Sequence, residues 1–192
     1  MQARLSKRGH YGGEGGDSVK QQIIVSGTGG QGILFLTRFF AQAAMMTGLE
    51  VITSEIHGMA MRGGTVLSHI KVGPFKSPLV REGQADTALI LNLQNLALHK
   101  GFVKPGGLIF VNTATPGDYR SIDATGIALK AGSSAATNLV FLGYVVRQNG
   151  FFCEADTARQ VLKQLSPRAQ LEVNLKGFEM GFASDRRDEP GR

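Results

Sequence analysis

Short apolar runs that are typical of strands alternate with longer segments in which apolar residues recur at helical spacing. The predicted strands are 21–26, 49–53, 65–72, 86–91, 108–111 and 119–124. The predicted helices are 31–47, 93–101, 125–131, 135–149 and two that close the chain, the second of them capped by Ser166. This alternation predicts an α/β protein with three layers (α/β/α), in which helices cover both faces of a mostly parallel sheet.

For two of these segments, the apolar composition also indicates where in the fold they lie. The strand 86–91 is almost continuously apolar, which is typical of a central strand covered on both faces. The helix 135–149, which Ser134 is expected to cap, is apolar nearly all round. We therefore expect this helix to be buried within the domain or against a partner.

The charged and polar residues divide the chain into one domain and two ends. Residues 1–18 form a polar run interrupted by glycines, which predicts a disordered arm. Residues 19–184 contain all the periodic segments and are predicted to form a single α/β domain, while residues 185–192 are a charged tail. A length of 192 residues suits one domain with a sizeable core.

The composition excludes several classes of function. The formal charge is +6, but six of the arginines and lysines lie in the first ten and last seven residues, so we expect no nucleic-acid partner. No apolar run reaches the roughly 18 residues of a membrane span, so we expect no membrane partner. The single cysteine, Cys153, cannot form an internal disulfide or hold an iron–sulfur cluster, which takes about four thiolates. These features predict a cytoplasmic protein.

The first predicted strand runs into a glycine cluster with the spacing G-x-G-x-x-G. We expect Gly27 to turn the chain off the strand, Gly29 to let another group approach the backbone, and Gly32 to bring the helix near the strand. Unpaired N–H groups at the helix start would then bind an anion such as a phosphate or pyrophosphate. The plain alternative is a tight turn that holds nothing. The candidate anion-binding residues are Gly27, Thr28, Gly29, Gly30, Gln31 and Gly32.

A second unusual segment, Ser54–Gly64, contains an acid, an imidazole and a guanidinium among glycines. If the first two strands are parallel neighbours, this segment emerges beside the glycine cluster. Glu55 is then a candidate for binding a ribose hydroxyl, and His57 is a candidate for acid–base chemistry. Arg62 is a candidate for binding a phosphate through two hydrogen bonds, and its alternative is a structural salt bridge. No single one of these candidates is identified as catalytic by the sequence.

Together, residues 27–33 and 54–64 resemble the gamma-type domain of the 2-oxoacid:ferredoxin oxidoreductases, closest to the small beta subunits of indolepyruvate ferredoxin oxidoreductases. Further matching pieces are Ser77–Leu79, Ala85–Asp86, Lys104–Gly107, Val111–Thr113, Asn138, Asn174 and Phe178. The resemblance covers about residues 19–182. Met61 departs from it, because a polar residue such as glutamine is expected there.

The resemblance implies a subunit of an enzyme that oxidatively decarboxylates 2-oxoacids, here arylpyruvates, to acyl-coenzyme A and passes the electrons to ferredoxin. It also implies that thiamine diphosphate, magnesium and the iron–sulfur clusters belong to a larger partner subunit, which meets ferredoxin. Coenzyme A is then a co-substrate of the complex, and this chain is expected to be inactive alone and able to self-associate when isolated. Its own contribution could be to shape the active-site entrance, to help receive coenzyme A or to hold the assembly together.

Two other functions are compatible with the residues. One is a stand-alone dinucleotide-binding oxidoreductase, which would need its own acid–base pair, for which Glu55 and His57 are the nearby candidates. The other is a nucleotide-binding or scaffolding module without chemistry. A neighbouring gene that encodes a thiamine-binding, cysteine-rich protein would favour the subunit over both alternatives.

Overall fold

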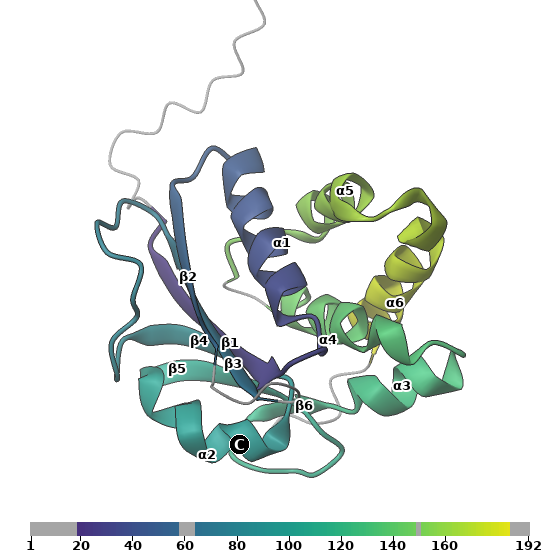
Figure 1. The fold of residues 1–192 in the computed structure, drawn as a ribbon, viewed down its shortest axis with the longest axis horizontal. Helices are drawn as coiled ribbons and strands as arrows, with labels where there is room; N and C mark the ends of the chain where they lie inside the picture. Colours follow the sequence, from purple (N-terminus) through teal and green to yellow (C-terminus); the bar gives the residue numbers. More distant parts are fainter. Residues whose placement is uncertain (1–18, 58–63, 149–150, 185–192) are drawn as a thin grey trace, which may run out of the picture.

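The computed structural model describes residues 19–57, 64–148 and 151–184 (Figure 1). The predicted arm 1–18, the predicted tail 185–192 and most of the segment 54–64 lie outside the described residues. Among the described residues, no helix is long and apolar enough to cross a membrane.

A sheet of six strands forms the centre of the protein, in the order β2-β3-β1-β4-β5-β6. The strands are β1 (Gln21–Thr28), β2 (Val51–His57), β3 (Thr65–Val72), β4 (Ala85–Ile90), β5 (Val103–Asn112) and β6 (Arg120–Ile122). β1, β4, β5 and β6 pair in parallel, whereas β3 runs antiparallel to both of its neighbours. The prediction of a mostly parallel sheet is confirmed, with β3 as the strand that makes it mixed.

β3 also separates the two strands that were expected to be neighbours. β1 and β2 point in the same direction, but each pairs with β3, so that Val66 lies between Gly27 and His57. β2 is thereby an edge strand, and it extends through His57 rather than ending at residue 53. Four residues of the predicted loop 54–64, residues 54–57, therefore belong to β2.

Helices cover both faces of the sheet, as the alternation of segments predicted (Figure 1). The larger layer consists of α1 (Ile33–Met46), α3 (Ala124–Lys130), α4 (Thr137–Val146), α5 (Ala155–Leu165) and α6 (Leu171–Ala183). The opposite face carries the short helical segment of η1 (Leu93–Asn95), α2 (Leu96–His99) and η2 (Lys100–Phe102). Two further 3-10 turns, η3 (Ser134–Ala136) and η4 (Arg168–Gln170), precede α4 and α6.

Alternate residues of the central strands supply the two cores. Ile23 and Val25 of β1 pack under the larger helical layer, while Ile24 packs on the opposite face with Leu96 and Phe102. Residues 138–146 of α4 are all buried, which confirms the burial expected for this apolar helix. Hydrophobic burial on both faces therefore fixes the register of β1.

The glycines of α4 and α6 let these two helices cross closely. A Cβ on Gly181 would overlap the backbone carbonyl of Val140, and one on Gly143 would overlap the backbone of Phe178. Small residues at a crossing allow backbones to approach, so the larger layer is fixed by this contact as well as by the sheet.

Three local predictions were wrong. Ser134 does not cap the buried helix, because it begins η3, whose N-cap is Ser133, and α4 follows from Thr137. Ser166 ends α5 instead of capping α6, and its hydroxyl accepts a hydrogen bond from Asn174 Nδ2 at 2.9 Å. β5 begins five residues before the predicted strand 108–111, and residues 105–107 form an irregularity inside it, where the pairing with β4 shifts.

Candidate functional site

The glycine loop lies where β1 passes into α1, at the carboxyl edge of the sheet. β1 continues through Gly27 to Thr28, so Gly27 does not turn the chain as predicted. A Cβ at Gly27 would lie 2.7 Å from both Gln31 Oε1 and Ile33 Cδ1. Gly27 is therefore the residue that allows the first turn of α1 to pack on the strand, the role expected of Gly32.

Gly32 makes room for a different neighbour. It is the N-cap of α1 with φ 79°, a left-handed conformation that favours glycine. A Cβ there would overlap the carboxamide of Asn138 on α4. Gly30 also has a positive φ of 94°, whereas Gly29 is not among the positive-φ glycines of the described residues. The close approach at Gly29 is to the second loop, since its N–H donates to the Gly64 carbonyl at 3.0 Å.

The side chain of Gln31 folds back into the glycine loop and holds it in shape. Its Oε1 accepts a hydrogen bond from the Thr28 N–H at 2.7 Å, and its Nε2 donates to the Leu91 carbonyl at 3.3 Å. The Thr28 N–H is therefore satisfied inside the protein. Any anion would have to bind on the outer side of the loop, toward α4.

Asn112 connects the ends of β4 and β5 to the same region. Its Nδ2 donates to the Leu91 carbonyl at 3.2 Å and to Thr125 Oγ1 at 2.9 Å. The Leu91 carbonyl thus joins Gln31 and Asn112, so the loops after β1, β4 and β5 form one hydrogen-bonded network. Ligands of α/β sheets bind beyond these carboxyl ends.

A cavity of about 300 Å³ opens on the outer side of this network. Its lining residues are Gly30, Gln31, Gly32, Thr125, Ser134, Ala135, Thr137 and Asn138. They come from the starts of α1 and α4, from η3 and from the first turn of α3. None of these residues carries a charge, so the cavity presents backbone, hydroxyl and carboxamide groups.

Asn138 is a polar residue of this cavity whose carboxamide has no hydrogen-bond partner among the described residues. The residue is only 7% exposed, and its carboxamide makes no hydrogen bond within the part of the chain that the structure describes. Buried polar groups are nearly always paired, so an unpaired carboxamide at a cavity wall indicates a ligand or water. The motifs quoted in the sequence analysis included Asn138 without a role; its burial against Gly32 was not visible in the sequence.

The residues expected from the second loop lie farther away or outside the described residues. Glu55 is exposed in β2 and pairs with Ser68, which in turn pairs with Val25. Two strand spacings of about 4.8 Å therefore separate the backbone of Glu55 from β1. The side chain of His57 and the whole of Arg62 lie outside the described residues.

This arrangement removes the geometry on which ribose binding by Glu55 depended. In a dinucleotide-binding fold, the ribose-binding acid follows a strand that is the direct neighbour of β1. Here the antiparallel β3 occupies that position.

A serine and a histidine meet beneath the other face of the sheet. Ser26 Oγ lies 2.9 Å from His99 Nδ1, and Asn95 Nδ2 donates to Ser26 Oγ at 3.1 Å. Ser26 is completely buried, so no substrate reaches its hydroxyl. Burial lowers the pKa of His99 and of the neighbouring His69. This cluster is therefore structural.

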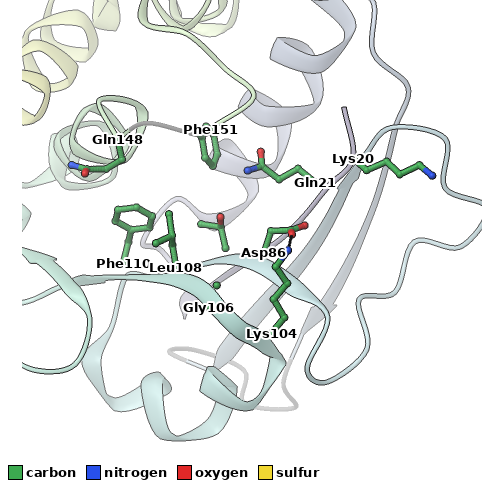
Figure 2. Close-up of a pocket in the computed structure, with 11 residues that line it drawn as sticks. Lys20, Gln21, Asp86, Lys104, Gly106, Leu108, Phe110, Gln148 and Phe151 are labelled. Atoms are coloured by element: carbon green, nitrogen blue, oxygen red, sulfur yellow. Dashed lines mark hydrogen bonds and ion pairs between the residues drawn. The ribbon is translucent and has the colours of Figure 1, made fainter. Parts of the chain in front are cut away.

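A second cavity of about 290 Å³ lies at the opposite, amino edge of the parallel strands (Figure 2). Figure 2 shows Lys104 pointing toward Asp86, with which it forms an ion pair, and Asp86 also accepts a hydrogen bond from the Gln22 N–H at 2.6 Å. Gln148 in its wall accepts a hydrogen bond from Arg120 at 2.9 Å. The carboxylate and these polar groups are thus used within the protein, in contrast to Asn138.

Metal ligation finds no support in the described residues, among which no group of three His, Cys, Asp or Glu side chains could hold an ion. Cys153 is buried, and burial raises the pKa of its thiol to about 12. A thiol with this pKa is protonated at neutral pH and is neither a nucleophile nor a metal ligand.

Comparison with known proteins gives a consistent match over nearly the whole described domain. The family described as pyruvate ferredoxin/flavodoxin oxidoreductase matches residues 22–184. The indolepyruvate oxidoreductase subunit IorB of Archaeoglobus fulgidus is 30% identical, over 85% of this chain and 94% of the relative. The protein of the same name from Methanothermobacter thermautotrophicus is also 30% identical, over 86% of this chain and 98% of the relative.

The fold has a solved counterpart of the same extent. The gamma subunit of a keto/oxoacid ferredoxin oxidoreductase from Geobacter sulfurreducens superposes with a TM-score of 0.68 at 27% identity. The match covers 84% of this chain and 96% of that subunit. Both comparisons thus match this chain to polypeptides of about its own length.

Proposed function

The chain belongs to the pyruvate ferredoxin/flavodoxin oxidoreductase family, and from this premise we propose that it is the small subunit of an arylpyruvate:ferredoxin oxidoreductase. The complex converts an arylpyruvate and coenzyme A to an aryl-acetyl-coenzyme A, carbon dioxide and a proton. The two electrons released pass to ferredoxin. The indolepyruvate subunits at about 30% identity favour aromatic substrates over the smaller 2-oxoacids.

The observation that carries this proposal is the match in length. The chain covers 94% and 98% of two relatives that are named as subunits, so its counterpart is a whole subunit rather than a fragment of an enzyme. A relative named ketoisovalerate oxidoreductase subunit VorA is matched over 35% of its length, which shows this unit fused into a larger subunit there. Because this unit occurs both as a separate subunit and as part of a longer subunit, we expect it to contact the rest of the complex in both forms.

The residues of this chain do not fit the redox cofactors that the family uses. An iron–sulfur cluster takes about four thiolates, and the whole sequence contains one cysteine, which is buried and protonated. We therefore assign the clusters, thiamine diphosphate and magnesium to a larger partner subunit, through which ferredoxin also binds. A chain with one thiol needs no oxidising compartment, and we place the complex in the cytoplasm.

The proposal also concerns the two predicted loops, which meet at one edge of the sheet. The glycine loop and Gly64 are joined by a hydrogen bond of 3.0 Å, so the second loop returns to the sheet beside the first. We propose that this edge faces the active site of the complex. Glu55, His57 and Arg62 stay the charged candidates of the second segment, with β3 separating Glu55 from the glycine loop. Substitution of Arg62 by alanine is then expected to lower activity of the complex more than its melting temperature.

The substrate class is tested on the complex formed with the cysteine-rich partner. Reduction of a viologen dye is measured with coenzyme A and each of indolepyruvate, phenylpyruvate, pyruvate, 2-oxoglutarate and 2-oxoisovalerate. The proposal predicts kcat/KM at least about tenfold higher for the two aromatic acids, because one extra buried group discriminates by roughly this factor. Equal or higher kcat/KM for pyruvate would contradict the aromatic assignment while leaving the family membership intact.

A further inference from the structure

β2 is the last strand of the sheet, and no strand of the described residues pairs with its outer side, the side away from β3. Proteins protect such strands by short length, prolines, lysines or bulges, because a long regular edge pairs with other chains. β6, at the other end of the sheet, has only three residues. β2 has seven residues, no proline, no lysine and no bulge, and Glu55 is its one acidic residue. Its outer side is therefore open to another strand.

Large apolar side chains are exposed beside β2 on both faces of the sheet. Ile56 of β2 is 49% exposed and pairs with Leu67, which belongs to the core on the face that carries α2. On the other face, Leu34 and Met45 of α1 are 39% and 64% exposed. They are 11 residues apart, which is close to three full turns, so both lie on one side of α1. Exposed apolar groups on both faces of an open strand indicate a protein interface.

The exposed side of α1 is distinct from the side that contacts α5. Gln42 marks the side toward α5, since its Nε2 donates to Gln164 Oε1 at 3.1 Å. At about 100° per residue, Leu34 lies about 80° and Met45 about 60° round the helix from Gln42. Figure 1 shows α5 and β2 on opposite sides of α1, and α1 contacts both. The side chains of Leu34 and Met45 therefore face solvent and the side of the molecule that ends at β2.

We infer that two copies of this chain pair through the outer sides of their β2 strands, antiparallel and related by a two-fold axis at Ser54. Ile52 of each copy then lies opposite Ile56 of the other, and Thr53 lies opposite Glu55. An axis at Glu55 would place two carboxylates opposite each other, and an axis at Thr53 would place Ile52 opposite Ser54. The axis at Ser54 pairs apolar residues with each other and separates the like charges. β2 is thus complementary to a second copy of itself.

The same axis brings the two α1 helices together over the paired strands. Because α1 returns from the end of β1 to the start of β2, it runs antiparallel to β2. A two-fold axis through the middle of β2 therefore places Leu34 of one copy near Met45 of the other, and Arg38 near Ala41 rather than near a second arginine. Specific interfaces bury at least roughly 1,200 Å² of total surface, and the helix contact adds to what the strands bury. The inference goes beyond the proposed reaction and does not depend on the substrate or the partner subunit.

Cysteine cross-linking of the full chain tests the position of the axis. In Ser54→Cys the two new thiols lie opposite each other, with Cα atoms about 4.5–5.5 Å apart, which a disulfide can bridge. The matched control, Ser134→Cys, places a thiol at an exposed serine of η3, and the natural Cys153 is buried. Under mild oxidation, the Ser54 variant should form a covalent dimer about tenfold faster than the control. Equal rates for the two variants would overturn the inference.

Sedimentation equilibrium of the full chain, which needs no cysteine variant, tests the interface itself at protein concentrations of about 1–300 μM. The inference predicts a monomer–dimer equilibrium that Met45→Lys and Ile56→Lys each weaken by about tenfold or more, since each places a charge in the interface.

Both positions are exposed, so the fold should persist, and circular dichroism verifies this. The matched control, Leu98→Lys, changes a 65% exposed leucine of α2 outside the interface and should leave the dimer constant within about twofold. A chain that is monomeric throughout, or a dimer that both β2-side variants leave unchanged, would overturn the inference. These measurements involve neither the partner subunit nor viologen reduction, so their failure is distinct from failure of the proposed function.

Discussion

Replacing Gln31 by alanine tests how the glycine loop keeps its shape. The variant loses the hydrogen bond from the Thr28 N–H at 2.7 Å and the one to the Leu91 carbonyl at 3.3 Å. Each such bond contributes about 1 kcal/mol net, so the free energy of unfolding should fall by about 2 kcal/mol. For a chain of this size, about 2 kcal/mol corresponds to a decrease in melting temperature of about 4–8 °C.

The matched control is Gln42→Ala, which removes a side chain of the same length from an exposed pair with Gln164. Its melting temperature should stay within about 2 °C of the original, because exposed side-chain contacts contribute little. Both variants are unfolded by heating and followed by circular dichroism. Equal melting temperatures for the Gln31 and Gln42 variants would refute the claim that Gln31 braces the loop.

Three further predictions concern the rest of the fold. Gly181→Ala forces a methyl group into the backbone of α4 and should lower the free energy of unfolding by about 1–2 kcal/mol, measured by thermal unfolding. The control is Gly101→Ala, where a Cβ meets nothing within 4 Å, and it should change the free energy of unfolding by less than about 0.5 kcal/mol. Similar values for the two variants would show that α4 and α6 do not cross as described. Burial lowers the pKa of His69 and His99, so the unfolded state, in which their pKa is about 6.5, binds protons at these residues more readily than the folded state. Melting temperature should therefore be constant above this pH and fall below it, and the double variant to glutamine should show a smaller fall between pH 6.5 and 5.5. Cys153, with a pKa of about 12, should react with iodoacetamide at pH 8 only after unfolding in urea, and rapid labelling of the folded chain would contradict its burial.

The sequence predicted the central elements because hydrophobic periodicity reports burial directly. β3 was predicted over the residues that form it, and α4 was expected to be buried because it lacks a polar face. Strand order, in contrast, does not follow from hydrophobic periodicity. The pattern of residues 51–72 does not indicate that β3 inserts antiparallel between β1 and β2. An arrangement with β2 directly beside β1 would bury the same side chains.

The glycine motif shows the same limit at the site. Its spacing correctly indicated a strand-to-helix turn, but not which neighbour each glycine admits. Gly32 admits Asn138, which is 106 positions away in the sequence, and that contact depends on how α4 packs on α1. The caps at Ser134 and Ser166 were misplaced because short 3-10 turns precede the helices, and serine favours both kinds of start.

The central claim is that this chain is a required subunit of a larger oxidoreductase. The most direct measurement titrates the chain into a fixed concentration of the proposed cysteine-rich partner subunit and follows viologen reduction with indolepyruvate and coenzyme A. The account predicts no turnover by either protein alone and activity that rises to saturation at a fixed molar ratio of the two. Full activity of the partner alone, unchanged by addition of this chain, would contradict it.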